Sequence, residues 1–127
     1  MNVPIRSAAL AVTGLVFFGG VALGTVLHQE PQLFVMMYTT GPAWDPAIPP
    51  AQQRHFDQHS ANLARLRQDG QIVMGGRFGQ WGLILVRADD EAGAQALFAA
   101  DSSLASGTFR AELHRWSTIY EGSVTRR

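Results

Sequence analysis

The segment HFDQHSANLARLRQDGQIVMGG (residues 55–76) carries the clearest local structure signals in the chain. Apolar residues recur in this segment up to Leu66, and Gly70 follows them, after Arg65 and Arg67. Basic residues followed by glycine are typical of a helix end. Residues 71–74 then predict a strand that leads into a glycine pair. The predicted helix places one histidine among apolar residues spaced three and four apart, on a single face: Phe56, His59, Leu63 and Leu66.

Length and composition are those of one globular domain, with 127 residues of which 46% are hydrophobic. The net charge is zero and no basic cluster occurs, so we expect neither nucleic-acid binding nor an electrostatic membrane patch. Cysteine and lysine are both absent, which excludes thiol catalysis, thiolate metal sites, disulfides and Schiff-base chemistry. Histidines, carboxylates, arginines, tyrosines and hydroxyl groups remain as the reactive side chains.

Residues 1–27 have the features of a signal peptide or an N-terminal membrane anchor. Arg6 is followed by an apolar run in which no charge appears before Glu30, the layout of an export signal. Small residues at Ala22 and Gly24 suit cleavage after Gly24, but the run also has the roughly 20 residues that span a bilayer. Either alternative places the rest of the chain in the periplasm or outside the cytoplasm, with membrane contact only through an uncleaved segment.

The remainder of the chain predicts a single folded unit without internal repeats. Residues 28–32 form a polar linker, residues 33–122 form the domain, and residues 123–127 form a disordered tail. The domain begins with LFVMMYTT (residues 33–40), a predicted strand that is apolar on both faces. A strand with one solvated face would alternate, so we expect both faces to be covered.

A proline-rich loop at residues 41–50 separates this strand from the first helix, expected from Pro50 to Asp69. Trp44 lies in the loop, where it either overhangs a cleft or packs the loop down. GGRFGQWG (residues 75–82) predicts a hairpin connection rather than a phosphate-binding loop, because no helix follows it.

Three further elements complete the domain. WGLILVRA (residues 81–88) predicts a strand, again apolar on both faces, and a helix follows from Glu91 to about Ala100. Capping-type residues at 101–107 end this helix. In the last predicted strand (residues 109–122), one face carries Phe109, Ala111, Leu113 and Ile119, and the other carries His114, Trp116 and Tyr120.

The order strand, helix, strand, strand, helix, strand predicts an α+β fold of the ferredoxin-like βαββαβ type. Such a fold has a four-stranded antiparallel sheet with two helices on one face. Because two strands are apolar on both faces, the second face also needs a cover, and a second copy of the chain is the simplest one. The sequence therefore predicts a homodimer that forms a dimeric α+β barrel.

These segments resemble the YCII-related domain family of dimeric α+β barrel proteins. The resemblance covers residues 33–122 and is carried by LFVMMY, GPAWDP, HSANLARLRQDGQIVMGG, WGLILVRADDEAGAQALFAADSSLASGTF and AELHRW. It implies a histidine and an aspartate as an acid/base pair, at His59 and Asp101. Ser102 is a departure, since the family often has proline after this aspartate.

His59 and Asp101 allow two interpretations. In the first, His59 is a general acid/base whose imidazole Asp101 orients. In the second, His59 is a core histidine with satisfied hydrogen bonds and Asp101 is a helix cap. His55 and His59, one helical turn apart, have no clear third partner for a metal ion, so we expect no metal and no cofactor.

Other polar and aromatic residues are candidates for substrate binding: Trp44, Arg77, His114 and Trp116. Arg77, like Arg110, either pairs with an anionic substrate or is a solvated surface charge. His114 shares a strand face with Trp116, where the pair lines either a cleft or a dimer interface.

These features predict an exported homodimer that performs acid/base chemistry, as a lyase or isomerase, on a small organic molecule. The alternative is a non-catalytic dimeric barrel that binds a small ligand or has a structural role, because one fold hosts many functions. The two are distinguished by whether His59 and Asp101 meet within hydrogen-bond distance beside an open pocket.

Overall fold

The computed structural model describes residues 30–125, so the predicted signal or anchor segment at residues 1–27 lies outside the described chain. The elements follow in the order β1 (Gln32–Thr40), a 3-10 helix η1 (Pro50–Gln52), α1 (Phe56–Gln68), β2 (Ile72–Phe78), β3 (Trp81–Ala88), α2 (Glu91–Leu97), α3 (Ser102–Ala105) and β4 (Phe109–Arg115). No helix within the described residues is long and apolar enough to cross a membrane.

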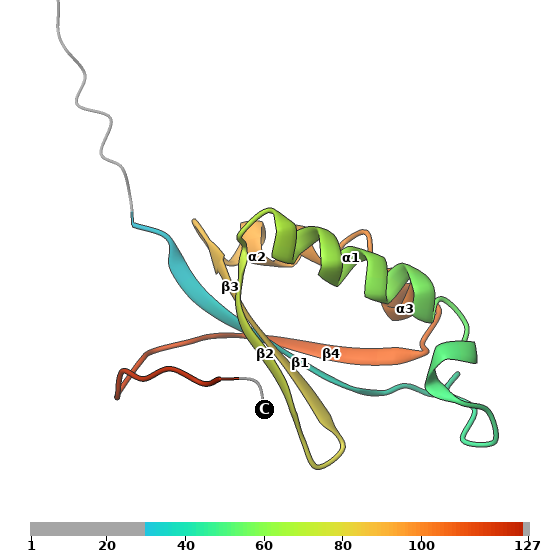
Figure 1. The fold of residues 1–127 in the computed structure, drawn as a ribbon. Coiled ribbons are helices and arrows are strands. Elements are labelled where there is room, and N and C mark those ends of the chain that lie inside the picture. Colours follow the sequence, from blue (N-terminus) through green and yellow to red (C-terminus); the bar gives the residue numbers. More distant parts are fainter. Residues whose placement is uncertain (1–29, 126–127) are drawn as a thin grey trace, which may run out of the picture.

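The strands form one antiparallel sheet in the order β2-β3-β1-β4. β1 lies inside the sheet between β3 and β4, and β2 is at the edge beyond β3. Helices α1, α2 and α3 lie over the same face of the sheet (Figure 1). The predicted α+β architecture with a four-stranded antiparallel sheet is thereby confirmed.

The core fills the space between the helices and the sheet. Alternate residues of β1 point into it because successive side chains of a strand face opposite sides. These residues are Phe34, Met36 and Tyr38, and they pack with Val86 of β3, Leu66 of α1, and Ala94 and Phe98 from the α2 region. The helical stripe predicted from the spacing of apolar residues accordingly faces the sheet.

The opposite side of the sheet, called the open face below, is apolar along the middle of β1 and β3 but carries Arg87 on β3 and Arg110, Glu112 and His114 on β4. It carries the residues of β1 and β3 that alternate with the core positions, namely Leu33, Val35, Met37, Leu83 and Leu85. Phe78 pairs with Trp81 on the same face and is 49% exposed. β1 and β3 are thus apolar on both faces, as expected from the sequence. Val35 and Leu85 are nevertheless buried in the single chain, and the exposed apolar residues of this face lie on the edge strand β2, at Met74 and Phe78.

The connection between β2 and β3 differs from the sequence prediction. β2 continues to Phe78, and only Gly79 and Gln80 form the turn, so the prediction of a connection over residues 75–82 was wrong. Gly75 pairs with Ile84 as a strand residue. The turn signal belongs to Gly79, whose φ of 54° lies in the left-handed region that favours glycine.

Both predicted helices are shorter than expected. A 3-10 turn precedes α1, and His55, with a φ of 59°, separates the two, so the α-helix begins at Phe56 rather than at Pro50. Helix α2 ends at Leu97, and the segment expected to be only a break contains α3, which begins after Asp101. The Asp101 carboxylate accepts a hydrogen bond from the backbone of Ser103 and so caps this short helix.

β4 ends at Arg115, and the prediction that it continues to residue 122 was wrong. The Trp116 amide still donates to the Leu33 carbonyl, but β1 begins at Gln32 and offers no partner for the residues that follow. Ile119 and Tyr120 are 84% and 91% exposed, so they do not belong to two packed strand faces. Residues 123–125 of the predicted tail form neither helix nor strand.

Candidate functional site

His59 and Asp101 meet in the folded chain. Nδ1 of His59 lies 2.7 Å from Oδ2 of Asp101, although the residues are far apart in sequence. The Asp101 side chain is fully buried, and the His59 side chain is 12% exposed. One end of the pair is therefore closed to solvent and the other remains accessible.

Three elements hold the His59 ring in place. Helix α1 carries the residue in its first turn on the sheet-facing side. The ring centroid lies 4.7 Å from that of Phe109 of β4 and 5.0 Å from that of Tyr38 of β1, which meets it edge-on. Because the neighbours are rigid aromatic rings, the imidazole has little freedom to reorient.

Asp101 is held by further hydrogen bonds. Its Oδ1 accepts from both the backbone amide and the hydroxyl of Ser103. The Tyr38 hydroxyl donates to Oδ2 at 3.3 Å, on the oxygen that also faces His59. Both carboxylate oxygens are thus occupied, as a buried charge requires.

These contacts set the ionisation of the site. Burial opposes the charged form of Asp101, but the hydrogen bonds from His59 and Ser103 and the positive charge of His59 outweigh it and hold the pKa of Asp101 below its usual range. Burial, followed by the charge of Asp101 and the hydrogen bond to it, raises the pKa of Tyr38. At neutral pH the site therefore contains an ionised carboxylate and a protonated phenol.

The tautomer of His59 follows from this ionisation. An ionised carboxylate only accepts hydrogen bonds, so Nδ1 of His59 must donate to Asp101. In the neutral ring Nε2 then carries a lone pair instead of a proton. Within residues 30–125 no hydrogen bond engages Nε2, which leaves it able to accept a proton from a bound molecule.

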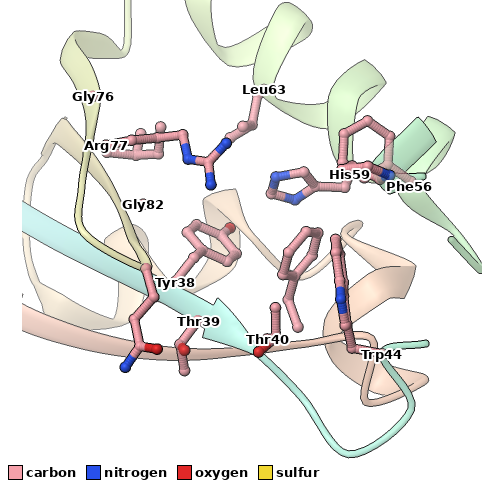
Figure 2. Close-up of a pocket in the computed structure, with 14 residues that line it drawn as sticks. Tyr38, Thr39, Thr40, Trp44, Phe56, His59, Leu63, Gly76, Arg77 and Gly82 are labelled. Atoms are coloured by element: carbon pink, nitrogen blue, oxygen red, sulfur yellow. The ribbon is translucent and has the colours of Figure 1, made fainter. Parts of the chain in front are cut away.

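A cavity of about 380 Å³ adjoins the accessible side of His59. It lies between the end of β1, the loop after β1, the first turns of α1 and the β2–β3 hairpin. Figure 2 shows the His59 ring directed into this space, with Trp44 and Phe56 beside it. Among the described residues, its lining includes no Asp or Glu.

Trp44 and Arg77, both predicted from the sequence as substrate-binding residues, line this cavity. The Trp44 ring lies 5.4 Å from that of Phe109. Gln53 fixes the loop that carries Trp44, because its Oε1 accepts from the Asp45 amide at 2.9 Å and its Nε2 donates to the Ile48 carbonyl at 3.2 Å. The Trp44 ring thus packs the loop against β4 and also forms a wall of the cavity.

His114 and Trp116 lie elsewhere. His114 pairs with Val35, an open-face residue, so its side chain points away from the helices. Its Nε2 lies 3.3 Å from Glu112. Trp116 follows β4 and donates from its indole to Thr118. Neither residue lines the cavity beside His59.

His55 does not converge with His59 on a common point. Nδ1 of His55 faces the Gln58 amide oxygen, and its Nε2 accepts from Nε of Arg54 at 3.2 Å. Within residues 30–125, no group of three or more His, Asp or Glu side chains is arranged to hold a metal ion.

Sequence reasoning missed Tyr38, Ser103 and Phe109 as parts of the site. Tyr38 ends the apolar run of β1, and its hydroxyl is the only polar group on the core-facing positions of that run. This placement was the one available signal, since a buried phenol needs a hydrogen-bond partner. Ser103 and Phe109 carried no comparable signal because short polar turns and strand aromatics are common.

Comparisons with family models, curated proteins and solved structures gave no match to this chain. Its function must therefore be inferred from the chemistry of the site itself.

Proposed function

We propose that this protein is an acid/base enzyme of the lyase or isomerase type that acts on a small organic molecule through His59. The observation that carries the proposal is the buried Asp101 carboxylate bonded to Nδ1 of His59, while Nε2 of the same ring faces a cavity. This arrangement prepares one nitrogen to take and return a proton. A histidine that served only the core would not need a cavity in front of it.

The proposed reaction starts with removal of a proton from a carbon next to a carbonyl group by Nε2 of His59. The electron pair of the broken C–H bond moves into the carbonyl and forms an enolate. In an isomerisation the imidazolium then returns the proton to the enolate oxygen and gives the enol. In an elimination the enolate re-forms the carbonyl and a carbon–carbon double bond, the bond to a leaving group on the next carbon breaks, and the imidazolium protonates that group. Asp101 is a positioning residue in this scheme because it holds the ring and fixes its tautomer without contacting the substrate.

The resemblance to the YCII-related family extends the proposal to the whole molecule. The element order and the strand order β2-β3-β1-β4 support a ferredoxin-like domain. The exposed apolar residues of the open face, Met74 and Phe78, support a homodimer in which a second sheet covers this face, as in a dimeric α+β barrel. Arg6 and the apolar run after it support export to the periplasm or a membrane-anchored position outside the cytoplasm.

Phenylpyruvate is a suitable probe for the reaction because it combines an acidic CH₂ group with a neighbouring carbonyl. Proton NMR in heavy water would follow loss of the CH₂ signal in the presence of the purified domain. We expect the wild type to accelerate exchange and His59→Gln to lose about 100-fold or more of that rate. His114→Gln is the matched control, since it removes an open-face histidine and should leave the rate unchanged.

Equal rates for the wild type and His59→Gln, with both variants folded, would contradict the enzymatic proposal. The protein would then be a non-catalytic domain that binds a ligand in the same cavity.

A further inference from the structure

Arg77 is directed into the cavity by an irregularity in β2. Ile72 pairs with Val86 and faces the helices, but the register shifts between Ile72 and Met74. In a regular strand, Met74 and Gly76 would follow Ile72 on the side of the helices. The bulge shifts the alternation by one residue, so Gly75 and Arg77 face the helices instead. Bulges commonly redirect a side chain next to a functional site.

The surroundings of Arg77 leave room for its guanidinium to reach a ligand. Its cross-strand partner is Gly82, which has no side chain to compete for the space. Figure 2 shows the guanidinium directed into the cavity from the hairpin, opposite the His59 ring. Arg77 forms no ion pair within residues 30–125. Asp101, the one buried carboxylate among these residues, is engaged by His59, Tyr38 and Ser103.

The other side of the cavity is aromatic. The Phe109 ring lies 5.4 Å from that of Trp44 and 6.2 Å from that of Phe56. Flat rings at these separations present π faces and edges that suit a planar apolar group. A cationic group would meet Arg77 and would find no carboxylate in the lining, so the charge of the site favours an anion.

From this geometry we infer that the cavity takes a small molecule with one planar apolar group and one carboxylate. The planar group lies against Trp44, Phe56 and Phe109, and the carboxylate pairs with Arg77. A cavity of about 150 Å³ holds benzene, so the observed 380 Å³ leaves space for a ring and a short acid chain. The atoms between ring and carboxylate then lie in front of His59, so the inference rests on the proposed function and names its class of substrate.

Ligand binding can be measured without any turnover. Phenylacetate is the probe, and phenylacetamide and phenethylamine are its neutral and cationic counterparts. Isothermal titration calorimetry on the wild type should rank phenylacetate first. Arg77→Gln should weaken phenylacetate binding by about 10- to 100-fold, the loss expected for a charge-assisted bidentate pair, and leave phenylacetamide binding unchanged.

Arg87→Gln is the matched control. Arg87 lies on β3 beside the core residue Val86, so its side chain faces the open side, and the substitution changes the net charge by the same amount. It should bind phenylacetate as the wild type does.

The inference would be overturned by equal phenylacetate affinity in the wild type and Arg77→Gln, by preference for phenethylamine, or by absence of phenylacetate binding. Arg77-dependent binding without any phenylpyruvate exchange would instead refute the enzymatic proposal and leave the assigned ligand class standing.

Discussion

At the scale of single residues, the orientation of Asp101 determines what His59 can do. One carboxylate oxygen receives the obligate backbone donor of Ser103, and the other receives Nδ1 of His59. The two oxygens therefore accept hydrogen bonds from different donors, although the carboxylate itself is symmetric. An amide in place of the carboxylate loses this symmetry.

Asp101→Asn should therefore reverse the His59 tautomer. The Ser103 amide requires an acceptor, so the new carboxamide places its oxygen there and its NH₂ toward His59. Nδ1 would then accept, and the proton of the neutral ring would move to Nε2, which faces the cavity. Nitrogen chemical shifts of the labelled ring distinguish the two tautomers, and phenylpyruvate exchange should fall together with the change. Retention of the wild-type nitrogen shifts in the variant would show that Asp101 does not set the tautomer.

The pKa of Asp101 leads to a prediction about stability. Since this pKa is lower in the folded chain than in the unfolded chain, ionised Asp101 stabilises the fold. The contribution is complete above the unfolded value of about 3.9 and is lost as the pH falls through the lower folded value. Urea unfolding should show Asp101→Asn to be less stable than the wild type by about 1–3 kcal/mol at neutral pH, with a smaller gap in strong acid.

Asp69→Asn provides the control for this experiment. Asp69 is 52% exposed and pairs with Arg65 on the surface of α1, so its loss should change stability by no more than about 0.5 kcal/mol. A gap between the wild type and Asp101→Asn that stays constant at all pH values would contradict the assigned role of the Asp101 charge.

At the scale of elements, the loop after β1 is attached to the end of α3 by a close backbone contact. The Gly41 amide donates to the Thr108 carbonyl at 2.8 Å, and the Ala43 amide donates to the Gly107 carbonyl at 3.0 Å. A Cβ atom on Gly41 would lie 2.1 Å from the Gly107 oxygen, far inside van der Waals distance. The loop that carries Trp44 can therefore keep this position only with glycine at residue 41.

Gly41→Ala should consequently lower stability by about 1–3 kcal/mol and disturb the cavity wall, because the backbone has to move apart. Thermal unfolding measures the first effect, and the affinity for phenylacetate measures the second. Gly122→Ala is the control, since a Cβ atom there meets nothing within 4 Å. An unchanged melting temperature in Gly41→Ala would mean that the contact with Gly107 is not required.

Elements with a strong period could be predicted from the sequence, whereas those set by tertiary contacts could not. The stripe that includes Leu63 and Leu66 placed α1 correctly against the sheet. The Gly75-Gly76 pair resembled a turn, yet both residues pair with β3 and belong to the edge strand β2. The short α3 depends on capping by Asp101, which a serine-rich segment does not reveal. The end of β4 is set by where β1 begins, which is a property of the pairing and not of β4 itself.

Only part of the candidate site could be predicted from the sequence, because contacts between distant segments determine the rest. The helical stripe singled out His59, the resemblance to a known family paired it with Asp101, and the loop at residues 41–50 suggested Trp44. Nothing in the local sequence indicated the β-bulge that turns Arg77 toward His59, because a shift in register exists only between two paired strands. The sequence also could not separate His114 from the cavity, because the direction of a side chain depends on the strand register.

At the scale of the whole molecule, the open face predicts the oligomeric state. Without residues 1–27, the domain should sediment at twice the mass of one chain. Phe78→Glu should shift it toward the monomer, because Phe78 is 49% exposed on that face and a buried unpaired charge at an interface is costly. Ala61→Glu on the outer side of α1 adds the same charge and should leave the dimer intact. A wild-type domain that stays monomeric at micromolar concentration would refute the dimer.

The central position of β1 has a consequence for the time at which the fold can form. β1 is the first of the four strands to be synthesised, yet one of its two partners is the last strand, β4, with Met37 opposite Glu112. Closing so long a loop costs conformational entropy before any contact compensates for it, and such pairing slows folding. While the chain emerges from the ribosome, its central strand has no complete sheet to join until β4 has been synthesised. Native pairing of the whole sheet is therefore a late event, which follows the synthesis of every other helix and strand that the structure describes.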